Sequence, residues 1–185
     1  MKVLLLNGPP RAGKDEIGRK LWNKLPPGTV RLKFAEPIIQ FMFKTYGIRM
    51  AEVNKDEPHP FLSGRTPRQV AIAYSEKFCK PLFGQEYFGE CALDEIKNME
   101  RIHQKLCIFT DSGFPHEARP VAAVYPTLQV RISRPGTSFI HDSRSYWDLP
   151  NIGVIPFDND APTLTALGDK VYADLVPEIV KWLAL

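Results

Sequence analysis

The sequence predicts an α/β protein of the three-layer α/β/α type, in which a mostly parallel central sheet lies between two layers of helices. Short apolar runs at residues 3–6, 106–110 and 128–132 have the length and hydrophobicity of strands that are buried on both faces. Segments with helical periodicity separate these runs. Strands that alternate with helices pair in parallel, because each crossover returns the chain to the same end of the sheet.

The N-terminal segment begins with the strand at residues 3–6, which runs directly into a glycine-containing loop. Ile17, Leu21 and Leu25 then recur at four-residue spacing, which predicts one apolar face of a helix. Pro26 ends that helix, because proline lacks the backbone N–H that the next turn requires. The order of strand, loop and helix is typical of the start of a parallel sheet.

The next segment predicts a strand at residues 30–34 and a buried helix at residues 38–46. The stretch from about 49 to 66 carries many charges and two prolines without steady periodicity, so we expect a mobile excursion on the substrate side rather than core. Thr66 is a candidate N-cap, and Pro67 suits the first position of a helix that we expect to reach about residue 78.

The second half of the chain predicts three more strands and two more helices. In order, these are a helix at 85–101, strands at 106–110, 128–132 and 154–157, and a final helix from residue 163 onward. Pro177 predicts a kink or break in the last helix. We find no linker or internal repeat, so residues 1–185 predict a single domain.

Composition excludes several classes of function. The 185 residues are 44% hydrophobic and 24% charged, which is ordinary for a globular domain with a sizeable core. A formal net charge of +3 is too small to indicate a nucleic-acid-binding face, so we expect no nucleic-acid partner. The apolar run at residues 3–6 is too short for a signal peptide or a membrane span, so we expect no membrane partner and a cytoplasmic location.

Residues 8–14 read GPPRAGK and match the phosphate-loop (P-loop) pattern GxxxxGK, between a strand and a helix as the motif requires. In such a loop, backbone N–H groups surround phosphate oxygens, the helix N-terminus adds a positive dipole, and the lysine reaches the β and γ phosphates. We therefore expect an ATP site. Its expected contacts are Gly8, Arg11, Ala12, Gly13, Lys14 and Asp15. The alternative is a structural glycine turn with a solvated lysine.

Two aspartates are candidate ligands of Mg²⁺. Asp15 follows Lys14 directly, where the general pattern has a serine or threonine hydroxyl for the metal. Because a bare carboxylate would repel phosphates there, it predicts coordination of Mg²⁺, directly or through water. Asp111 ends the strand at 106–110, at the sheet edge where α/β proteins bind ligands. The alternatives are a helix-start acid at Asp15 and a turn cap at Asp111.

Phosphoryl transfer spreads negative charge over phosphate oxygens, and fixed guanidinium groups stabilise that charge. Arg65 and Arg68 flank the start of a predicted helix and are candidates for binding an acceptor phosphate. Three further arginines lie in loops or at the ends of predicted elements and are candidates for closing over the reaction: Arg131, Arg134 and Arg144. Each of these arginines could also be a solvated surface residue.

Phe34 and Glu36 follow the second predicted strand at the same edge of the sheet. Phe34 could stack on a nucleobase, and Glu36 could accept a hydrogen bond from a base or sugar. Core packing for Phe34 and a helix-start position for Glu36 are equally consistent with the sequence. The histidines show no HExxH spacing, so we do not expect a histidine metal site.

Several short motifs occur in a fixed order along nearly the whole chain. They are GPPRAGKDEIG at 8–18, FAEP at 34–37, GRTPRQ at 64–69, FGQEYF at 83–88, TDSGFPHEA at 110–118, RISRPG at 131–136 and FDND at 157–160. In this order the motifs resemble those of the bacteriophage-type deoxynucleoside monophosphate kinases, members of the P-loop kinase superfamily. The aspartate directly after GK is the most telling match.

The resemblance implies a P-loop kinase fold and transfer of the γ-phosphoryl group of ATP to the 5′-phosphate of a deoxynucleoside monophosphate, with Mg²⁺ as cofactor. We assign catalysis to Lys14, Asp15, Asp111 and Arg134 on this interpretation. Small-molecule nucleotides are the expected partners, and the enzyme is expected to be a monomer or homodimer. A phage-encoded protein would act in the host cytoplasm.

The chain departs from the resembled pattern at three places. Glu16 replaces a threonine, Ser112-Gly113 replaces an arginine before Phe-Pro, and Arg144 stands where a glutamate is expected. Two alternative functions therefore stay open. One is a P-loop kinase of another phosphorylated small molecule, because some phosphomevalonate kinases share the GKD loop, and the other is a nucleotide-binding module that has lost its transferase activity.

Overall fold

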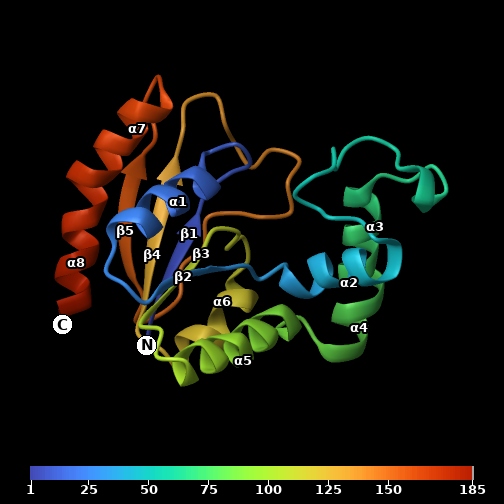
Figure 1. The fold of residues 1–185 in the computed structure, drawn as a ribbon, viewed down its shortest axis with the longest axis horizontal. Coiled ribbons are helices and arrows are strands. Elements are labelled where there is room, and N and C mark those ends of the chain that lie inside the picture. The colour runs from blue at the N-terminus through green and yellow to red at the C-terminus, as the bar shows by residue number, and fades with distance from the viewer. Residues whose placement is uncertain (185) are drawn as a thin grey trace.

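The computed structural model describes residues 1–184 and confirms the predicted α/β class. Its strands are β1 (Lys2–Asn7), β2 (Thr29–Leu32), β3 (Leu106–Phe109), β4 (Thr127–Ser133) and β5 (Gly153–Asp158). They form one sheet in the order β2-β3-β1-β4-β5 (Figure 1). Every pairing is parallel, so the sheet is wholly rather than mostly parallel.

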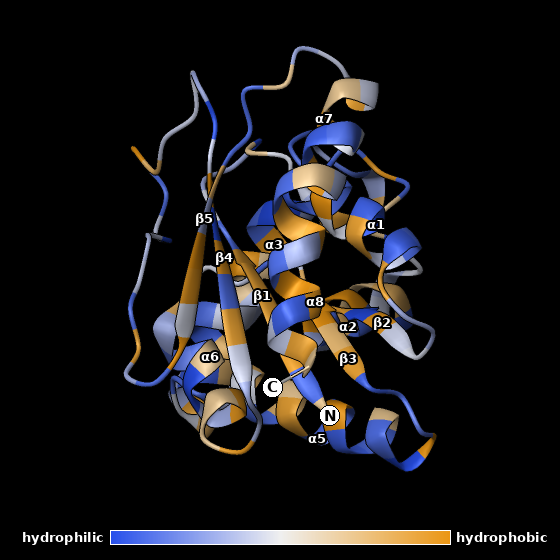
Figure 2. Ribbon diagram, turned by 90° about the vertical axis from the view of Figure 1, so that its left-hand side faces the viewer, coloured by the Kyte–Doolittle hydropathy of each residue, from blue (hydrophilic) through white to orange (hydrophobic). Residues whose placement is uncertain are grey.

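Strand β1 lies at the centre of the sheet, because its run of leucines leaves no polar face for solvent. Leu5 pairs with Phe109 of β3 and with Gln129 of β4. Strands β1 and β3 are hydrophobic along most of their length, and helices cover them on both sides (Figure 2). The parallel register brings the carboxyl ends of β1, β3 and β4 to one edge, where the phosphate loop begins.

The helices α1 (Lys14–Lys24), α7 (Leu164–Lys170) and α8 (Val176–Ala184) cover one face of the sheet (Figure 1). Leu4 and Leu6 of β1 point toward this layer and share a buried cluster with Ile17, Leu21 and residues of the C-terminal helices. The predicted strand–loop–helix start is therefore confirmed. No helix within residues 1–184 combines the length and the apolar character needed to cross a membrane.

The helices α5 (Tyr87–Arg101) and α6 (Pro115–Ala122) cover the opposite face. Val3 and Leu5 pack there against α5 and α6. The alternation of side chains along β1 thus divides its apolar residues between the two layers. Helix α6 was not predicted, since eight residues with an internal proline, Pro120, give little periodicity. Pro115 in its first turn and the acidic Glu117 were the available signals.

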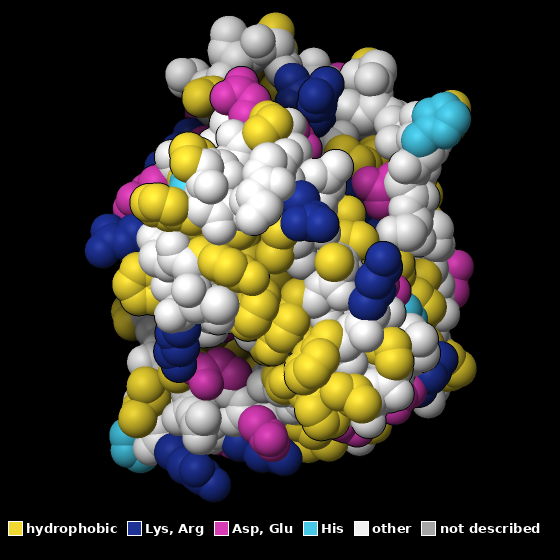
Figure 3. Space-filling view, turned by 90° about the vertical axis from the view of Figure 1, so that its right-hand side faces the viewer, with side chains coloured by type: hydrophobic (Ala, Val, Ile, Leu, Met, Phe, Trp, Pro, Cys, Tyr) yellow, Lys and Arg dark blue, Asp and Glu magenta, His cyan; other side chains and the backbone are white. Residues whose placement is uncertain are grey.

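The helices α2 (Glu36–Tyr46), α3 (Pro67–Tyr74) and α4 (Lys80–Phe83) extend away from the sheet on the right of Figure 1. Hydrophobic side chains gather across the middle of that side of the molecule (Figure 3). The excursion between α2 and α3 contains a short 3₁₀ helix, Pro60–Leu62. It is not wholly outside the core as expected, because Met50 and Leu62 are buried in a small cluster with Met42. Its mobility stays a prediction.

Two helical segments continue past a proline, because a π-helical turn precedes the proline in each. The π turn Ser75–Cys79 joins α3 to α4, so the helix predicted to end near residue 78 continues to Phe83. The π turn Val171–Leu175 joins α7 to α8 just before Pro177. The helix does not break at Pro177, because the chain changes its hydrogen bonding in the turn before the proline.

Candidate active site

The loop between β1 and α1 is shaped around glycine and a folded-back lysine. Gly13 has φ +90°, and a Cβ there would lie 2.6 Å from the Asn159 amide nitrogen, so both conformation and space require glycine. The Nζ atom of Lys14 donates hydrogen bonds to the carbonyls of Gly8 and Pro9, each at 2.7 Å. The first turn of α1 directs its N–H groups into this loop, as phosphate binding requires.

The environment of Lys14 disfavours its positive charge. Burial of the side chain and the nearby Arg144 guanidinium lower the pKa of Lys14 to about 8, although Asp15, Asp142 and Asp111 oppose the shift. A phosphate chain would supply the negative charge that this lysine lacks. This environment suits a lysine that binds an anion.

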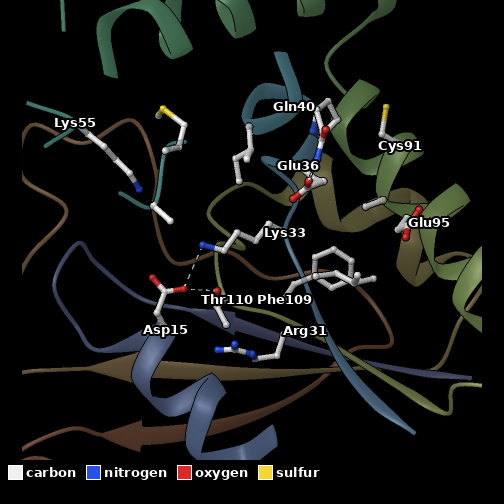
Figure 4. Close-up of a pocket in the computed structure, with 16 residues that line it drawn as sticks. Asp15, Arg31, Lys33, Glu36, Gln40, Lys55, Cys91, Glu95, Phe109 and Thr110 are labelled. Atoms are coloured by element: carbon white, nitrogen blue, oxygen red, sulfur yellow. Dashed lines mark hydrogen bonds and ion pairs between the residues drawn. The ribbon is translucent and has the colours of Figure 1, made fainter. Parts of the chain in front are cut away.

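Asp15 lies at the mouth of the loop with 77% of its side chain exposed. Its Oδ1 atom accepts a hydrogen bond from the Thr110 hydroxyl at 2.6 Å and lies 3.6 Å from the Lys33 Nζ atom (Figure 4). Loss of hydration raises the pKa of Asp15, but the Thr110 hydrogen bond and the Lys33 charge outweigh it and hold that pKa below its ordinary value. The carboxylate is therefore ionised at neutral pH.

Asp111 follows β3 and binds the backbone of the turn at residues 34–35. Its two carboxyl oxygens accept hydrogen bonds from the N–H groups of Phe34 and Ala35, both at 3.1 Å. Burial nevertheless raises the pKa of Asp111 above its ordinary value. Asp111 thus caps a turn as one of our two interpretations expected, although the turn is that of residues 34–35 and not the one before Phe114.

The arrangement fits Mg²⁺ at Asp15 better than at Asp111. Mg²⁺ prefers hard oxygen ligands and keeps several waters. The Oδ2 atom of Asp15 accepts no hydrogen bond from any residue in 1–184, whereas both oxygens of Asp111 are engaged. Within the described part of the chain, no three His, Cys, Asp or Glu side chains come together as a metal cluster. Phosphate oxygens and water would have to complete the ligand set.

Glu16 lies outside this group, although it follows Asp15 in the sequence. Its carboxylate accepts two hydrogen bonds from Arg19, at 2.6 and 3.0 Å, and lies 3.8 Å from Lys20 on the surface of α1. The hydroxyl beside Asp15 comes instead from Thr110, at the end of β3. Sequence reasoning missed Thr110, because only the parallel pairing of β1 with β3 brings the two residues together.

A cavity of about 770 Å³ opens beside the loop (Figure 4). Asp15 and Thr110 line the end nearest the loop, Lys33 and Lys55 point into the cavity, and Glu36 lies on the α2 side. The volume is in the range of sites for small ligands. Lys33 and Lys55 were also missed, because lysines in loops carry no periodic signal. The cavity joins the excursion, α2 and α5 to the phosphate loop.

The structure separates the two predicted base-binding residues. Glu36 lines the cavity and accepts a hydrogen bond from Gln40 at 2.7 Å. Phe34 is 2% exposed and stacks on Phe109 with ring centroids 4.4 Å apart, so it packs in the core. Core packing was one of the two interpretations that the sequence left open for Phe34.

The five predicted arginines occupy different environments. Arg65 lines a separate hollow of about 270 Å³ near Phe61, and Arg68 pairs with Asp56 at 2.5 Å. Arg131 pairs with Asn7 in the sheet, but its side chain donates to the Trp147 carbonyl and to Asp148. Arg134 donates to the Arg11 carbonyl at 3.2 Å. Arg144 is held by Asp142 and is the leading charge that lowers the pKa of Lys14. The structure therefore brings Arg134 and Arg144 to the phosphate loop.

Asn159 anchors the loop from the far end of the chain. It is 2% exposed, and its amide nitrogen donates to the Ala12 carbonyl at 2.8 Å. Asn159 was part of the FDND motif but was not predicted as a site residue. A single sequence gives no signal for such an anchor, because residues 12 and 159 meet only in the folded chain.

The parallel 2-3-1-4-5 sheet and the loop at its carboxyl edge define the class of this protein as a P-loop α/β protein with a kinase-type fold. No protein family matches the chain, and no curated protein matches it. Among solved structures, an unliganded sugar kinase from Janibacter sp. HTCC2649 is similar, with a TM-score of 0.56 and 9% sequence identity. The similarity covers 100% of this chain and 95% of that one. At this identity it shows the shared fold alone.

Proposed function

We propose that the protein is an ATP-dependent kinase that transfers the γ-phosphoryl group of ATP to the 5′-phosphate of a deoxynucleoside monophosphate. The observation that carries this proposal is the position of Asp15, which belongs both to the phosphate loop and to the wall of the 770 Å³ cavity. A donor phosphate at Lys14 and an acceptor in the cavity would meet at this residue.

The chain's own residues would act by positioning and charge neutralisation, since a phosphate acceptor is already an anion and needs no covalent catalysis. Lys14 and the loop N–H groups would bind the donor phosphates. When bound, Mg²⁺ would neutralise phosphate charge, and Asp15 would hold it while Thr110 orients that carboxylate. Arg134 and Arg144 would stabilise the transferred group, and Asp111 would keep the 34–35 turn in place.

The deoxynucleotide acceptor is supported by the ordered motifs from residue 8 to residue 160. The similar solved structure is titled a sugar kinase, which supports small-molecule phosphorylation as the reaction class without indicating the acceptor. The cavity offers cations at Lys33 and Lys55 for an acceptor phosphate, with Glu36 further in for a hydrogen bond to a base or sugar. Arg68 lies close by, because its N–H donates to the Lys55 carbonyl at 2.9 Å.

The experiment is a coupled assay of ADP release with ATP, Mg²⁺ and a panel of acceptors. The panel contains dAMP, dGMP, dCMP, dTMP, phosphomevalonate and hexose phosphates. We expect at least one deoxynucleotide to stimulate ADP release strongly and to be converted to its diphosphate. Stimulation by phosphomevalonate alone would replace the acceptor in our proposal but keep the kinase. ATP binding without stimulation by any acceptor would favour a module without transferase activity.

A further inference from the structure

We propose that Asp142 is a positioning residue that holds Arg144 against the transferred phosphoryl group, and that Gly113 leaves the space through which Arg144 reaches the phosphate loop. This inference rests on the proposed function. It assigns roles to two residues that were not among the predicted site residues, on two loops that the sheet brings together.

Asp142 binds Arg144 along one edge of its guanidinium group. The Asp142 carboxylate accepts hydrogen bonds from Nε at 2.8 Å and from Nη2 at 2.6 Å, and it also accepts the backbone N–H of Arg144 at 2.9 Å. This fork leaves the Nη1 edge without an acceptor among residues 1–184. A guanidinium held along one edge can offer its other N–H groups to a phosphate without losing side-chain freedom on binding.

The pair is more protected than an ordinary surface ion pair. The side chains of Arg144 and Asp142 are 28% and 19% exposed, whereas Arg68 and its partner Asp56 are 52% and 66% exposed. The hydrogen bond to Arg144 holds the pKa of Asp142 below its ordinary value. Water therefore competes less for Asp142 than for Asp56, and the Arg144 fork is held more firmly.

Gly113 leaves room for the side chain of Arg144. A Cβ atom at residue 113 would lie 2.5 Å from Arg144 Cγ and closer still to its Cδ, so the aliphatic part of the arginine lies directly on the glycine. These atoms form the stem and not the mobile end of the side chain. Alanine at 113 would therefore displace the arginine or strain the turn.

Asn7 at the end of β1 ties the two loops together. Its side-chain amide is fully buried and donates to the Ser112 carbonyl at 2.8 Å and to the Ser145 carbonyl at 3.1 Å. The turn that contains Gly113 and the segment that carries Arg144 are thus fixed to the strand that leads into the phosphate loop. The arrangement is therefore a mount that holds Arg144 near the phosphate loop, where its charge lowers the pKa of Lys14.

The test is a set of double-mutant cycles with Arg144→Ala, Asp142→Asn and Gly113→Ala, measured with the best acceptor from the panel. We expect Arg144→Ala to lower kcat on the order of a hundredfold, and each positioning variant to lower it about tenfold, with smaller changes in KM. In the Arg144→Ala background, the other two changes should have almost no further effect. The matched controls are Asp94→Asn, on the exposed surface of α5, and Gly168→Ala, where a Cβ atom would meet only the flexible end of the Lys20 side chain.

Equal losses in both backgrounds would overturn the proposal, because Asp142 and Gly113 would then act without Arg144. If Gly113→Ala fails to fold in thermal melts, the Asp142→Asn cycle still decides the question. If the wild-type protein phosphorylates no acceptor, the proposed function fails, and the same cycles are read from ATP affinity with Mg²⁺. Unchanged ATP affinity in Arg144→Ala would then also overturn the proposed positioning of Arg144. A weaker ATP affinity in each single variant, with no further loss in the double variants, would support it.

Discussion

Lys14 is the residue on which the proposed chemistry depends most. Among the described residues, its side chain donates hydrogen bonds only to carbonyl oxygens of its own loop, and burial disfavours its positive charge. A charged group of this kind contributes little to folding but much to binding an anion. Function and stability are therefore separable at this position.

We expect Lys14→Ala to lower turnover by on the order of a hundredfold to a thousandfold, because one fixed positive charge at the reacting phosphates is lost. The folded structure should remain, since the loop shape depends on Gly13 and Asn159. A coupled kinase assay and a thermal melt measure the two effects. Lys97→Ala on α5, which removes an exposed lysine, is the control, and equal activity in both variants would contradict the role of Lys14.

Glu117 is a buried acid that the proposed mechanism does not use. It is 8% exposed, and burial together with the Asp111 charge raises its pKa from 4.5 to about 8. The Lys80 and Arg144 charges oppose the shift without cancelling it. The folded state therefore binds a proton near neutral pH that the unfolded state has lost.

This difference makes stability fall as pH rises from about 4.5 to about 8. We expect Glu117→Gln to be more stable than wild type at pH 8, by on the order of a few kcal/mol, and to lose that advantage at pH 4. Urea denaturation at both pH values measures the effect. An advantage that stayed constant with pH would show that burial does not raise the pKa of Glu117 in the folded protein.

At the scale of elements, two prolines and one capping residue determine how the helices run. In each π turn the last N–H bonds five residues back, from Lys80 to Ser75 and from Val176 to Val171. A proline follows directly in both cases. Since proline has no N–H and its ring needs space in the preceding turn, a π turn at that point lets the helix continue. The sequence predicted a kink or break at Pro177, but it did not predict a π turn.

Thr66 begins α3 with a full capping box. Its hydroxyl accepts the Gln69 N–H at 3.1 Å, and the Gln69 side chain accepts the Thr66 N–H at 2.9 Å. We expect Thr66→Ala to lower the free energy of unfolding by about 1 kcal/mol, because the Gln69 N–H loses its partner. Urea denaturation measures this change. Thr45→Ala, at an exposed position in the last turn of α2, should be neutral or slightly stabilising, and equal losses would argue against the cap.

At the scale of the whole molecule, the phosphate loop is supported by residues from distant parts of the chain. Thr110 orients Asp15, and Asn159 holds Ala12. The parallel sheet makes these contacts possible, because it gathers the carboxyl ends of β1, β3 and β5 at one edge. Residues from two other strand ends therefore hold the loop in place.

We expect Asn159→Ala to weaken ATP binding about tenfold and to lower the free energy of unfolding by about 1–3 kcal/mol, because the buried Ala12 carbonyl loses its donor. Calorimetric titration with ATP and urea denaturation measure the two effects. Asn98→Ala on the surface of α5 is the matched control. An unchanged affinity in Asn159→Ala would mean that the loop keeps its shape without this anchor.

Much of the fold could be predicted from local pattern. The strands at residues 3–6 and 106–110 are continuous apolar runs, and the helix that begins at Thr66 has a cap and a first-turn proline. These signals lie within a few residues of one another, so a single sequence contains them. Helix α6 was missed, because its eight residues form mainly through packing against α5.

The sequence by itself determined the phosphate loop, the α/β class and the order of the five strands along the chain, since each depends on neighbouring residues and on runs of apolar side chains. Only the tertiary structure decided that Thr110 contacts Asp15, that Asn159 holds Ala12 and that Arg144 crosses Gly113. These contacts join residues 31 to 147 positions apart. The physical reason is that the parallel sheet, and no local motif, brings such residues to one edge.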